Sequence, residues 1–321
     1  MQQYIARRLI LGALTGVLVS LLIFGILRIA PGDVAMMIAL SESGGDEIEI
    51  TDEQLEELRE QLGLNVPLPQ QYFEWMGGWI TGDWGTSLFR QHNVFAQFKA
   101  KVLVTLELGV FSLVLSLIIS IPLGIMMALK QDTWMDYAGR VFCLLGLSIP
   151  NFWIGTLLLV GGMYWFNWNP RLGYVEFVDD PFGNLSQLFW PSIIIGYSAI
   201  VVKARMLRSS LLEVLRQDYI RTAHAKGLRG FVVTYRHALK NSLLPVVTVI
   251  GISFAGVVGG SVIMERIFSL PGLGNFLVEG MNQRDYPVVQ SLVTFFAMWI
   301  ILVNLLVDIS YAWLDPRIRL G

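Results

Sequence analysis

The sequence predicts an all-α integral membrane protein with six transmembrane helices and a long external segment between the first two. Of its 321 residues, 54% are hydrophobic and only 15% are charged, whereas soluble proteins carry about 25% charged residues. The apolar residues are concentrated in runs of about 18 or more, the length that a bilayer requires. Segments of about ten residues with alternating polarity, which would indicate a membrane β-barrel, are absent from the sequence.

The hydrophobic runs define the predicted spans. The first run would be about 31 Å long as a helix, and no small-residue cleavage site follows it, so we interpret it as a retained span rather than a signal peptide. The predicted spans are residues 9–29, 103–129, 139–166, 189–212, 246–264 and 289–313. They divide the chain into an N-terminal part (1–30), an external segment (31–101) and a core (102–321) that includes a polar loop (213–245).

The distribution of lysine and arginine predicts the orientation. Loops that stay on the cytoplasmic side are enriched in these residues, and alternate loops of this sequence are poor in them. We therefore expect both termini and the polar loop to be cytoplasmic. The basic residues on which this depends are Arg7, Arg8, Lys130, Arg140, Lys203, Arg205, Arg208, Arg216, Arg221, Lys226, Arg229, Arg236, Lys240, Arg317 and Arg319.

The external segment contains signals of its own secondary structure. Thr51 to Gln54 form a capping box, which predicts a helix that Gly63 would end. Residues 70–80 then carry five aromatic or methionine side chains. We interpret them either as an amphipathic helix at the membrane interface or as a docking surface for an external partner, and the two readings are compatible.

The polar loop contains a short predicted helix from Tyr219 to Lys226. Asp218 is a candidate N-cap, and Gly227 supplies the C′ residue that ends a helix without steric cost. Ala223 and Ala225 keep the predicted helix slim. A slim, capped helix between two membrane spans is suited to fit a groove on a partner protein.

Polar and small residues inside the spans are candidates for a solute pathway. Two Gly-x-x-x-Gly patterns, Gly12/Gly16 and Gly256/Gly260, indicate close helix packing, and the second lies in a span rich in small residues that leaves room for a solute. Asn304, Asp308 and Tyr311 share one helix face, as a structural polar cluster or as part of the pathway. The pathway candidates are Glu107, Ser253, Gly256, Gly260, Asn304 and Asp308.

The sequence lacks the common motifs of enzymes. It contains no Walker A motif, no His-Glu-x-x-His and no Gly-x-Ser-x-Gly. The three histidines are scattered and the single Cys143 lies in an apolar run, so we predict no metal site and interpret Cys143 as a small buried residue. No regular relay of ionisable residues crosses the spans, which argues against a proton-driven transporter.

The polar loop resembles the EAA motif of permease subunits of binding-protein-dependent ABC importers, which is roughly Glu-Ala-Ala-x3-Gly-x9-Ile-x-Leu-Pro. The corresponding residues are 222–224, Gly227 and 243–245, with Thr222 and His224 departing from the motif. The stretches 219–227 and 237–248 resemble the dipeptide/oligopeptide/nickel branch more closely. Further similarities to that branch are Arg7-Arg8, Ala30 to Asp33, Leu62-Gly63-Leu64, Gly82 to Ser87, Ser148-Ile149-Pro150, Phe268 to Gly274, Arg284 to Pro287, and Asp308 to Arg317.

This resemblance implies a type I importer permease subunit in a bacterial or archaeal inner membrane. Its partners would be a second permease, which the branch favours as a paralogue, two ATPase subunits, an external solute-binding protein and membrane lipid, but no nucleic acid. ATP and Mg would bind the ATPase subunits, so no cofactor is expected in this chain. The helix at 218–228 would couple to the ATPase subunits through Asp218, Tyr219, Arg221, Thr222, Ala223, His224, Ala225, Lys226, Gly227 and Leu228.

Two other classes of function remain at this point. One is a stand-alone secondary transporter or channel, and the other is a membrane anchor without a pathway of its own. Members of the branch carry peptides, nickel, glutathione or sugars, and the sequence does not distinguish among them.

Overall fold

The protein is described here by a computed structural model, in which residues 2–29, 36, 39, 51–61, 65–171 and 173–314 are placed. These residues are almost entirely helical, and an isolated bridge between Thr86 and Asn93 is their only β pairing. The all-α prediction is therefore confirmed. The chain forms two compact units: unit 1 comprises Met1–Leu103 and Gly272–Leu305, and unit 2 comprises Val104–Pro271 and Leu306–Gly321.

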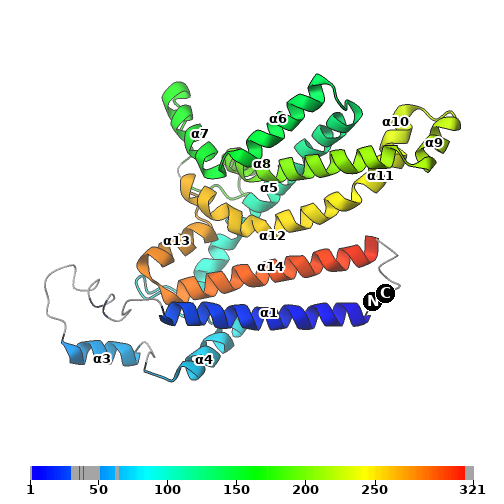
Figure 1. Ribbon diagram of the computed structural model, residues 1–321. Coiled ribbons are helices and arrows are strands. Elements are labelled where there is room, and N and C mark those ends of the chain that lie inside the picture. Colours follow the sequence, from blue (N-terminus) through cyan, green and yellow to red (C-terminus); the bar gives the residue numbers. More distant parts are fainter. Residues whose placement is uncertain are drawn as a thin grey trace. The chain divides into compact units, whose positions relative to one another are not determined.

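In unit 1, α1 (Gln2–Ile29) and α14 (Tyr286–Leu314) lie side by side (Figure 1). A Cβ atom added to Gly12 would lie 3.3 Å from Ile301, and one added to Gly16 would lie 2.8 Å from Met298. The first Gly-x-x-x-Gly pattern therefore allows the two helices to approach closely, as small residues do in membrane helix pairs.

The capping box in unit 1 is confirmed. In front of α3 (Asp52–Gln61), the Thr51 N–H donates to Gln54 Oε1 at 3.1 Å, and the Gln54 N–H donates to Thr51 Oγ1 at 3.4 Å. Each side chain thus satisfies a backbone donor that the first helical turn leaves unpaired. Gly63, the predicted end of this helix, lies outside the described residues.

The aromatic segment of unit 1 forms α4 (Leu68–Thr81), which begins two residues earlier than predicted because Pro69 is accommodated in the first turn. Its inner face packs on α1 and α14. Tyr72 shares a 2.8 Å hydrogen bond with Ser20, and the Trp79 indole donates to the Ser291 carbonyl at 3.3 Å. Its outer face exposes large apolar side chains, Phe73 and Ile80. An interfacial or docking role for this face stays a prediction.

Unit 2 is built around α8 (Pro181–Leu215), which contacts α6 (Trp134–Ser148), α7 (Asn151–Phe166) and α12 (Leu244–Ile267). The long helix α5 (Val94–Leu129) contributes most of its length to this unit and its first turns to unit 1. Because α5 starts at Val94, the last residues of the predicted external segment belong to this helix. Figure 1 shows α8 and α12 running side by side. The helix α13 (Leu273–Gln283) belongs to unit 1.

The predicted span at 139–166 is not one continuous helix. The chain forms α6 and α7 there, and the two helices are bent by 96°. The break lies at Ile149 and Pro150, whose backbones are extended with ψ of 122° and 136°. Proline lacks an N–H for the helical ladder and also restricts the residue before it to extended conformations, so a helix cannot pass through this point straight.

The number of membrane-spanning helices is consistent with the prediction only when bent pairs are included. The described part of the chain has four helices that are long and apolar enough to cross a membrane, and up to six spans if each of two bent pairs counts as one. The second pair joins residues 230–242 to the first half of α12 with a bend of 51°. Helix ends also lie several residues beyond those predicted, most clearly in α8, which extends over 35 residues.

Close contact between α5 and α8 should make Gly124 intolerant of even one methyl group. A Cβ atom there would lie 2.9 Å from the Ala204 carbonyl oxygen and 3.0 Å from Leu207 Cβ. We expect Gly124→Ala to destabilise the protein by about 1–3 kcal/mol through overpacking, measured as a lower melting temperature in detergent. Gly25→Ala is the matched control, because a Cβ atom at Gly25 meets nothing within 4 Å. Equal melting temperatures for the two variants would refute the close contact.

Candidate functional site

The short helix of the polar loop is α9 (Asp218–Ala225), one residue earlier than predicted. The N-cap prediction is wrong: Gln217 occupies the cap position without a side-chain hydrogen bond, and Asp218 is the first helical residue. The exposed Asp218 carboxylate instead accepts a 3.3 Å hydrogen bond from Arg221. A carboxylate in the first turn is still favourable, because the N-terminal end of a helix dipole is positive.

The end of α9 is the one predicted from Gly227. The Gly227 N–H donates to the His224 carbonyl at 2.9 Å, and the Leu228 N–H donates to the Ala223 carbonyl at 3.3 Å. This pair of bonds is a Schellman motif, which requires a left-handed residue at C′. Gly227 adopts that conformation with φ of +74°. The helix therefore has a defined end and does not fray into the following loop.

One face of α9 packs inside unit 2. Ile220 and Ala223 are buried in an apolar cluster, so Ala223 contributes to the protein's own core and not to an exposed coupling surface. The cluster joins α9 to the ends of α5, α8 and α12, and its buried members are Ile125, Ala128, Leu207, Leu211, Ile220, Ala223, Val233, Ala238 and Val246.

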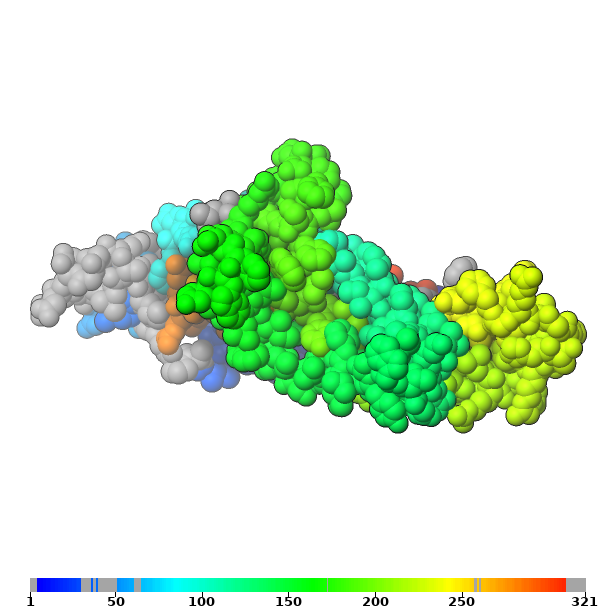
Figure 2. Space-filling model, turned by 90° about the horizontal axis from the view of Figure 1, so that it is seen from above, coloured from blue at the N-terminus to red at the C-terminus, as the bar shows by residue number. Residues whose placement is uncertain are grey.

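The other face of α9 is open. Figure 2 shows the loop that carries α9, in yellow, gathered at one end of unit 2. The exposed residues are the remaining candidates for coupling, namely Asp218, Tyr219, Arg221, Thr222, His224, Ala225, Lys226, Gly227 and Leu228.

The rest of the loop is helical, which the sequence did not predict. It consists of α10 (Gly230–Val232), a π-helix η1 (Val233–Ala238) and α11 (Leu239–Ser242). Val233 and Ala238 are fully buried, and the Asn241 amide donates to the Tyr219 hydroxyl at 2.9 Å. The loop is thus a packed structure, and its residues Val233 and Ala238 lie in the same apolar cluster as the buried face of α9. A π-helix has no 3.6-residue period, so hydrophobic periodicity does not reveal it.

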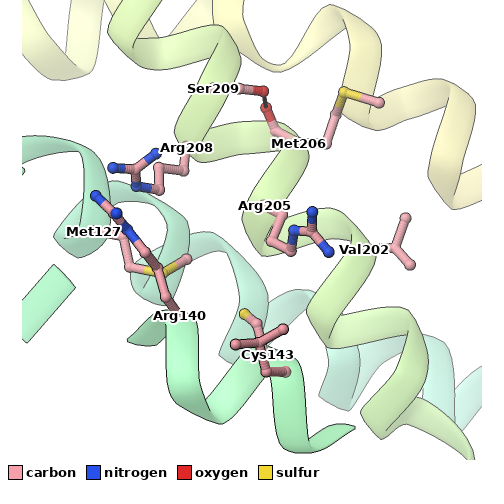
Figure 3. A pocket seen from close by; sticks show the side chains of 9 residues that line it. Met127, Arg140, Cys143, Val202, Arg205, Met206, Arg208 and Ser209 are labelled. Atoms are coloured by element: carbon pink, nitrogen blue, oxygen red, sulfur yellow. Dashed lines mark hydrogen bonds between the residues drawn. The ribbon is translucent and has the colours of Figure 1, made fainter. Parts of the chain in front are cut away.

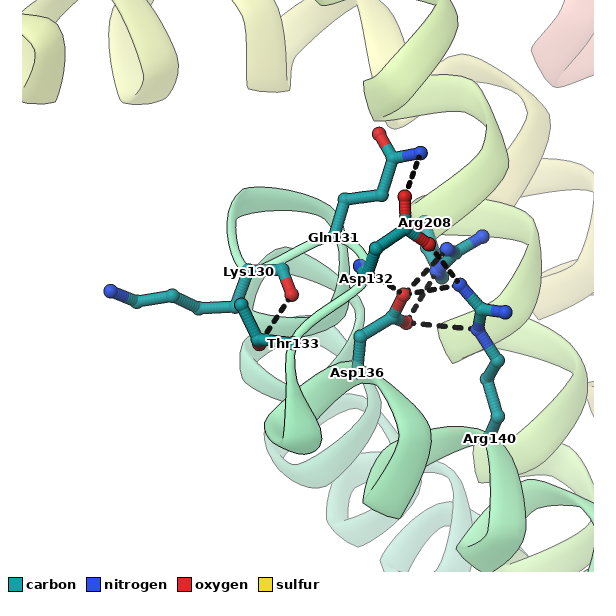
Figure 4. A network of polar contacts seen from close by, with 7 residues as sticks. All are labelled: Lys130, Gln131, Asp132, Thr133, Asp136, Arg140 and Arg208. Carbon is teal, nitrogen blue, oxygen red and sulfur yellow. Dashed lines mark hydrogen bonds and ion pairs between the residues drawn. The ribbon is translucent and has the colours of Figure 1, made fainter.

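A buried ion-pair network ties the α5–α6 turn to α8 (Figure 4). The Asp136 carboxylate is fully buried and accepts two hydrogen bonds of 2.8 Å from Arg208 of α8. It also accepts hydrogen bonds from Arg140 and, at 3.0 Å, from the Asp132 N–H. A carboxylate with this many charge-assisted bonds is held firmly. Arg140 and Arg208, which supported the predicted orientation, therefore have structural partners.

A hollow of about 620 Å³ lies beside this network (Figure 3). Arg140, Arg205 and Arg208 line it, together with the apolar side chains of Met127 and Met206. Cys143 also lines the hollow and is buried, as predicted for a small apolar residue.

A second cavity, of about 320 Å³, contains two of the predicted pathway residues, Ser253 and Gly256 of α12. A Cβ atom added to Gly256 would meet nothing within 4 Å, so this glycine leaves space, in contrast to the tightly packed Gly12 and Gly16. The other residues that line the cavity belong to α5, α7, α8 and α12 and are Ser112, Leu113, Ser116, Asn151, Ile195, Gly196, Ser198, Ala199, Val202, Lys203, Val249 and Ile252.

Lys203 is the cavity residue that sequence reasoning missed as a functional candidate. It was counted among the basic residues near the end of a span, but its side chain is fully buried and its Nζ donates to Ser116 Oγ at 2.8 Å. The signal was present in the sequence, because Lys203 lies inside the predicted span at 189–212. An ionisable residue inside a membrane span is a functional candidate by default.

Glu107 belongs to a different polar cluster. Its carboxylate accepts hydrogen bonds from Tyr174 and, at 2.9 Å, from the Asn184 amide. Burial raises the pKa of the Tyr174 phenol well above its usual range, so the hydroxyl stays protonated and donates. The structure thus uses Glu107 to fix the connection between α7 and α8, and Glu107 does not line the cavity that contains Ser253.

Two of the remaining pathway candidates lie in α14. Asn304, in unit 1, is exposed, and Asp308 is half-buried. Gly260 lies in α12, one turn beyond Gly256, and its surroundings lie outside what the structure describes. The side chain of Tyr311 also lies outside it. A pathway role for these residues stays a prediction.

In unit 1, two of the motif segments meet although about 200 residues separate them. Ser87 donates a hydrogen bond to the buried Asp285 carboxylate, and the Leu88 N–H donates to it at 3.4 Å. Arg90 and Glu279 form an ion pair nearby at 3.3 Å. The stretches 82–87 and 284–287 are thus the two sides of one contact that closes unit 1.

Asp285 should give unit 1 a pH-dependent stability. Burial raises the pKa of the Asp285 carboxyl, so the folded protein holds this proton more tightly than the unfolded chain does. The contribution is fully present below the ordinary aspartate pKa of about 4 and is lost as the pH rises through the folded-state pKa. We expect Asp285→Asn to reduce the fall in melting temperature between pH 4 and 7. Asp83→Asn, at an exposed site in the same unit, should leave that fall unchanged, and identical profiles for both variants would contradict the assignment.

The chain has helices long and apolar enough to cross a membrane, as an integral membrane protein requires. It belongs to the family described as binding-protein-dependent transport system inner membrane component, whose model matches residues 120–320. A second model, for the N-terminal part of such components, matches residues 1–108. The chain is thus an integral membrane protein of this family, as the motifs indicated.

Several named relatives are similar along nearly their whole length. The probable peptide ABC transporter permease protein y4tP of Sinorhizobium fredii is 36% identical over 316 residues, which cover 98% of this chain and 99% of the relative. The dipeptide transport system permease protein DppB of Escherichia coli K12 is 39% identical, with 99% of each chain covered. The putative peptide transport system permease protein BAB2_1050 of Brucella abortus is 37% identical, with 94% of each chain covered.

Proposed function

We propose that this chain is a permease subunit of an ATP-driven importer of peptides, forms half of the translocation pathway and couples to ATPase subunits through residues 218–228. The observation that carries the coupling role is the construction of α9. The face of α9 that carries Ile220 and Ala223 is packed in the core of unit 2. The helix ends at Gly227, and its opposite face is exposed. A helix held in this way transmits a force on its exposed face to α5, α8 and α12, against which it packs.

The family and the printed names of the relatives support the substrate class and the other components. The partners would be a second permease, favoured as a paralogue, two ATPase subunits that bind ATP and Mg, and a solute-binding protein on the side of residues 31–101. Both termini and the α9 loop would be cytoplasmic. The exposed basic residues Arg216, Arg221 and Lys226 of this loop support that orientation.

A stand-alone secondary transporter or channel is the less favoured reading. The family is described as dependent on a binding protein, and the named relatives are ABC transporter or transport-system permeases. The buried ionisable side chains Lys203 and Asp136 do not line one common cavity among the described residues.

Purification and transport measurements test this proposal. The chain, expressed with the products of its neighbouring genes, should co-purify with ATPase chains in stoichiometric amount. In proteoliposomes, uptake of a labelled dipeptide should require both ATP and the binding protein. Uptake that survives without ATP while an ion gradient is maintained would show that the chain is a secondary transporter instead.

A further inference from the structure

Lys203 stands out because its charge has no ionic partner among the described residues. Its side chain is fully buried in unit 2, and its Nζ donates to the hydroxyl of Ser116, which itself donates to the Leu113 carbonyl. Among the described residues, no carboxylate lies within ion-pair distance of Lys203. The buried Asp136 shows the contrast, because it pairs with two arginines.

A buried cation with a neutral partner is costly in a membrane protein. Buried charges are normally paired, and intramembrane lysines face a cavity or a counter-charge. The apolar side chain of leucine or methionine would fill this position in α8 without that cost. The structure therefore points to a counter-charge that arrives from outside the chain.

The cavity beside Lys203 is suited to an anion. Lys203 lines it together with Ser112, Ser116, Asn151, Ser198 and Ser253, whose side chains carry hydrogen-bond donors, and no acidic residue is among the described residues that line it. The four serine hydroxyls donate to carbonyls of their own helices, so they must rotate to bind an anion. Asn151 is also the first residue of the 16-residue helix α7, so the positive end of that helix dipole lies at the cavity wall.

The cavity also has room for part of a solute. Its volume of about 320 Å³ lies at the lower end of the range for small-molecule pockets, about 300–1,000 Å³. Ala199 and Gly256 contribute to this space, and a Cβ atom added at Gly256 would meet nothing within 4 Å. The wall combines serine hydroxyls with apolar side chains such as Leu113, Ile195 and Ile252 and is not shaped to one side chain, so it suits a group that all transported molecules share.

We propose that Lys203 is a binding residue for the terminal carboxylate of a peptide during its passage through this subunit. This inference rests on the proposed function, because peptides are the solutes considered. Every peptide with a free C-terminus carries one carboxylate, whatever its side chains are. In the structure the Lys203 ammonium donates to the Ser116 hydroxyl. On binding, the ammonium would exchange this hydroxyl for the carboxylate, and the Asn151 amide and any serine hydroxyl that rotates away from its helix carbonyl would supply further hydrogen bonds. A carboxylate of the second permease is the competing source of counter-charge.

Transport by the complete reconstituted complex tests the inference. Two labelled peptides that differ only in a free or an amidated C-terminus are each supplied above the concentration that saturates the binding protein, established in a separate titration. The wild-type complex should transport the free-carboxylate peptide at least tenfold faster. Lys203→Met should slow that peptide at least tenfold and leave the amidated peptide unchanged, whereas Lys203→Arg should retain most of the preference. Lys130→Met, at an exposed lysine in the α5–α6 turn, is the matched control and should behave as wild type.

Three results would overturn the inference. One is a wild-type complex that transports both peptides equally, which needs no variant and so does not depend on whether Lys203→Met folds. Another is a Lys203→Met complex that keeps the wild-type preference. The third is an equal loss of transport of both peptides in a Lys203→Met complex with a normal melting temperature. That result would indicate that the Lys203 ammonium pairs with a carboxylate of the second permease. A wild-type complex without ATP-dependent uptake of either peptide would instead contradict the proposed importer function.

Discussion

An Ala225→Trp variant should insert into the membrane normally but lose its ATPase partners and at least nine-tenths of its transport activity. Ala225 is the last residue of α9, and its small side chain is exposed. Tryptophan at this position adds bulk to the face that we propose to fit an ATPase groove, and overpacking of a well-fitted contact is destabilising. Co-purified ATPase chains and ATP-dependent uptake in proteoliposomes measure the effect.

Two further variants separate docking from folding. Ala100→Trp makes the same change at an exposed alanine in the first turns of α5 and should leave ATPase co-purification unchanged. Ala223→Leu adds volume inside the apolar cluster behind α9, so it should lower the melting temperature by destabilising the chain itself. Normal ATPase co-purification and uptake in Ala225→Trp would remove the evidence for coupling through this face.

Asp136→Asn should be among the most destabilising single substitutions in unit 2. Arg208 forms two 2.8 Å hydrogen bonds with the Asp136 carboxylate, and its side chain is only 19% exposed. Removing one partner of a buried ion pair costs about 3–5 kcal/mol because the other charge is left uncompensated. Arg140, the second partner, is more exposed and regains hydration, so we expect a loss of about 2–3 kcal/mol.

Asp132→Asn is the matched control for this prediction. The Asp132 side chain is 63% exposed and forms a single 3.2 Å ion pair with Arg140, an interaction of about 0–1 kcal/mol. Asparagine also tolerates the left-handed backbone that Asp132 adopts, with φ of 59°. Melting temperatures and denaturant titrations in detergent compare the two variants. Equal stability of both would show that the buried network contributes little.

The features that the sequence predicted well are those with local causes. A capping box needs four consecutive residues, and the end of α9 needs a glycine that adopts a positive φ, so both Thr51 and Gly227 could be assigned from their neighbours. The apolar runs predicted membrane helices because bilayer thickness fixes their length. The N-cap at Asp218 failed by one residue, which is within the usual uncertainty of a helix boundary.

The features that were missed depend on tertiary contacts. Lys203 lies inside a predicted span but close to the basic residues that flank its end, and its packing against Ser116 shows that the side chain is buried. Ala223 looked suited to a partner's groove, but the small side chain is needed behind α9. Pro150 was noted as part of a motif, while the apolar residues on either side of it favoured one continuous helix.

The apolar cluster behind α9 has a mechanical consequence. Because Ile220 and Ala223 are packed among the ends of α5, α8 and α12, a displacement of α9 would move these helix ends with it. α12 then acts as a lever arm, with Gly256 about 18 Å from the end of the helix at Leu244. Force applied to α9 would reach the cavity wall through this helix.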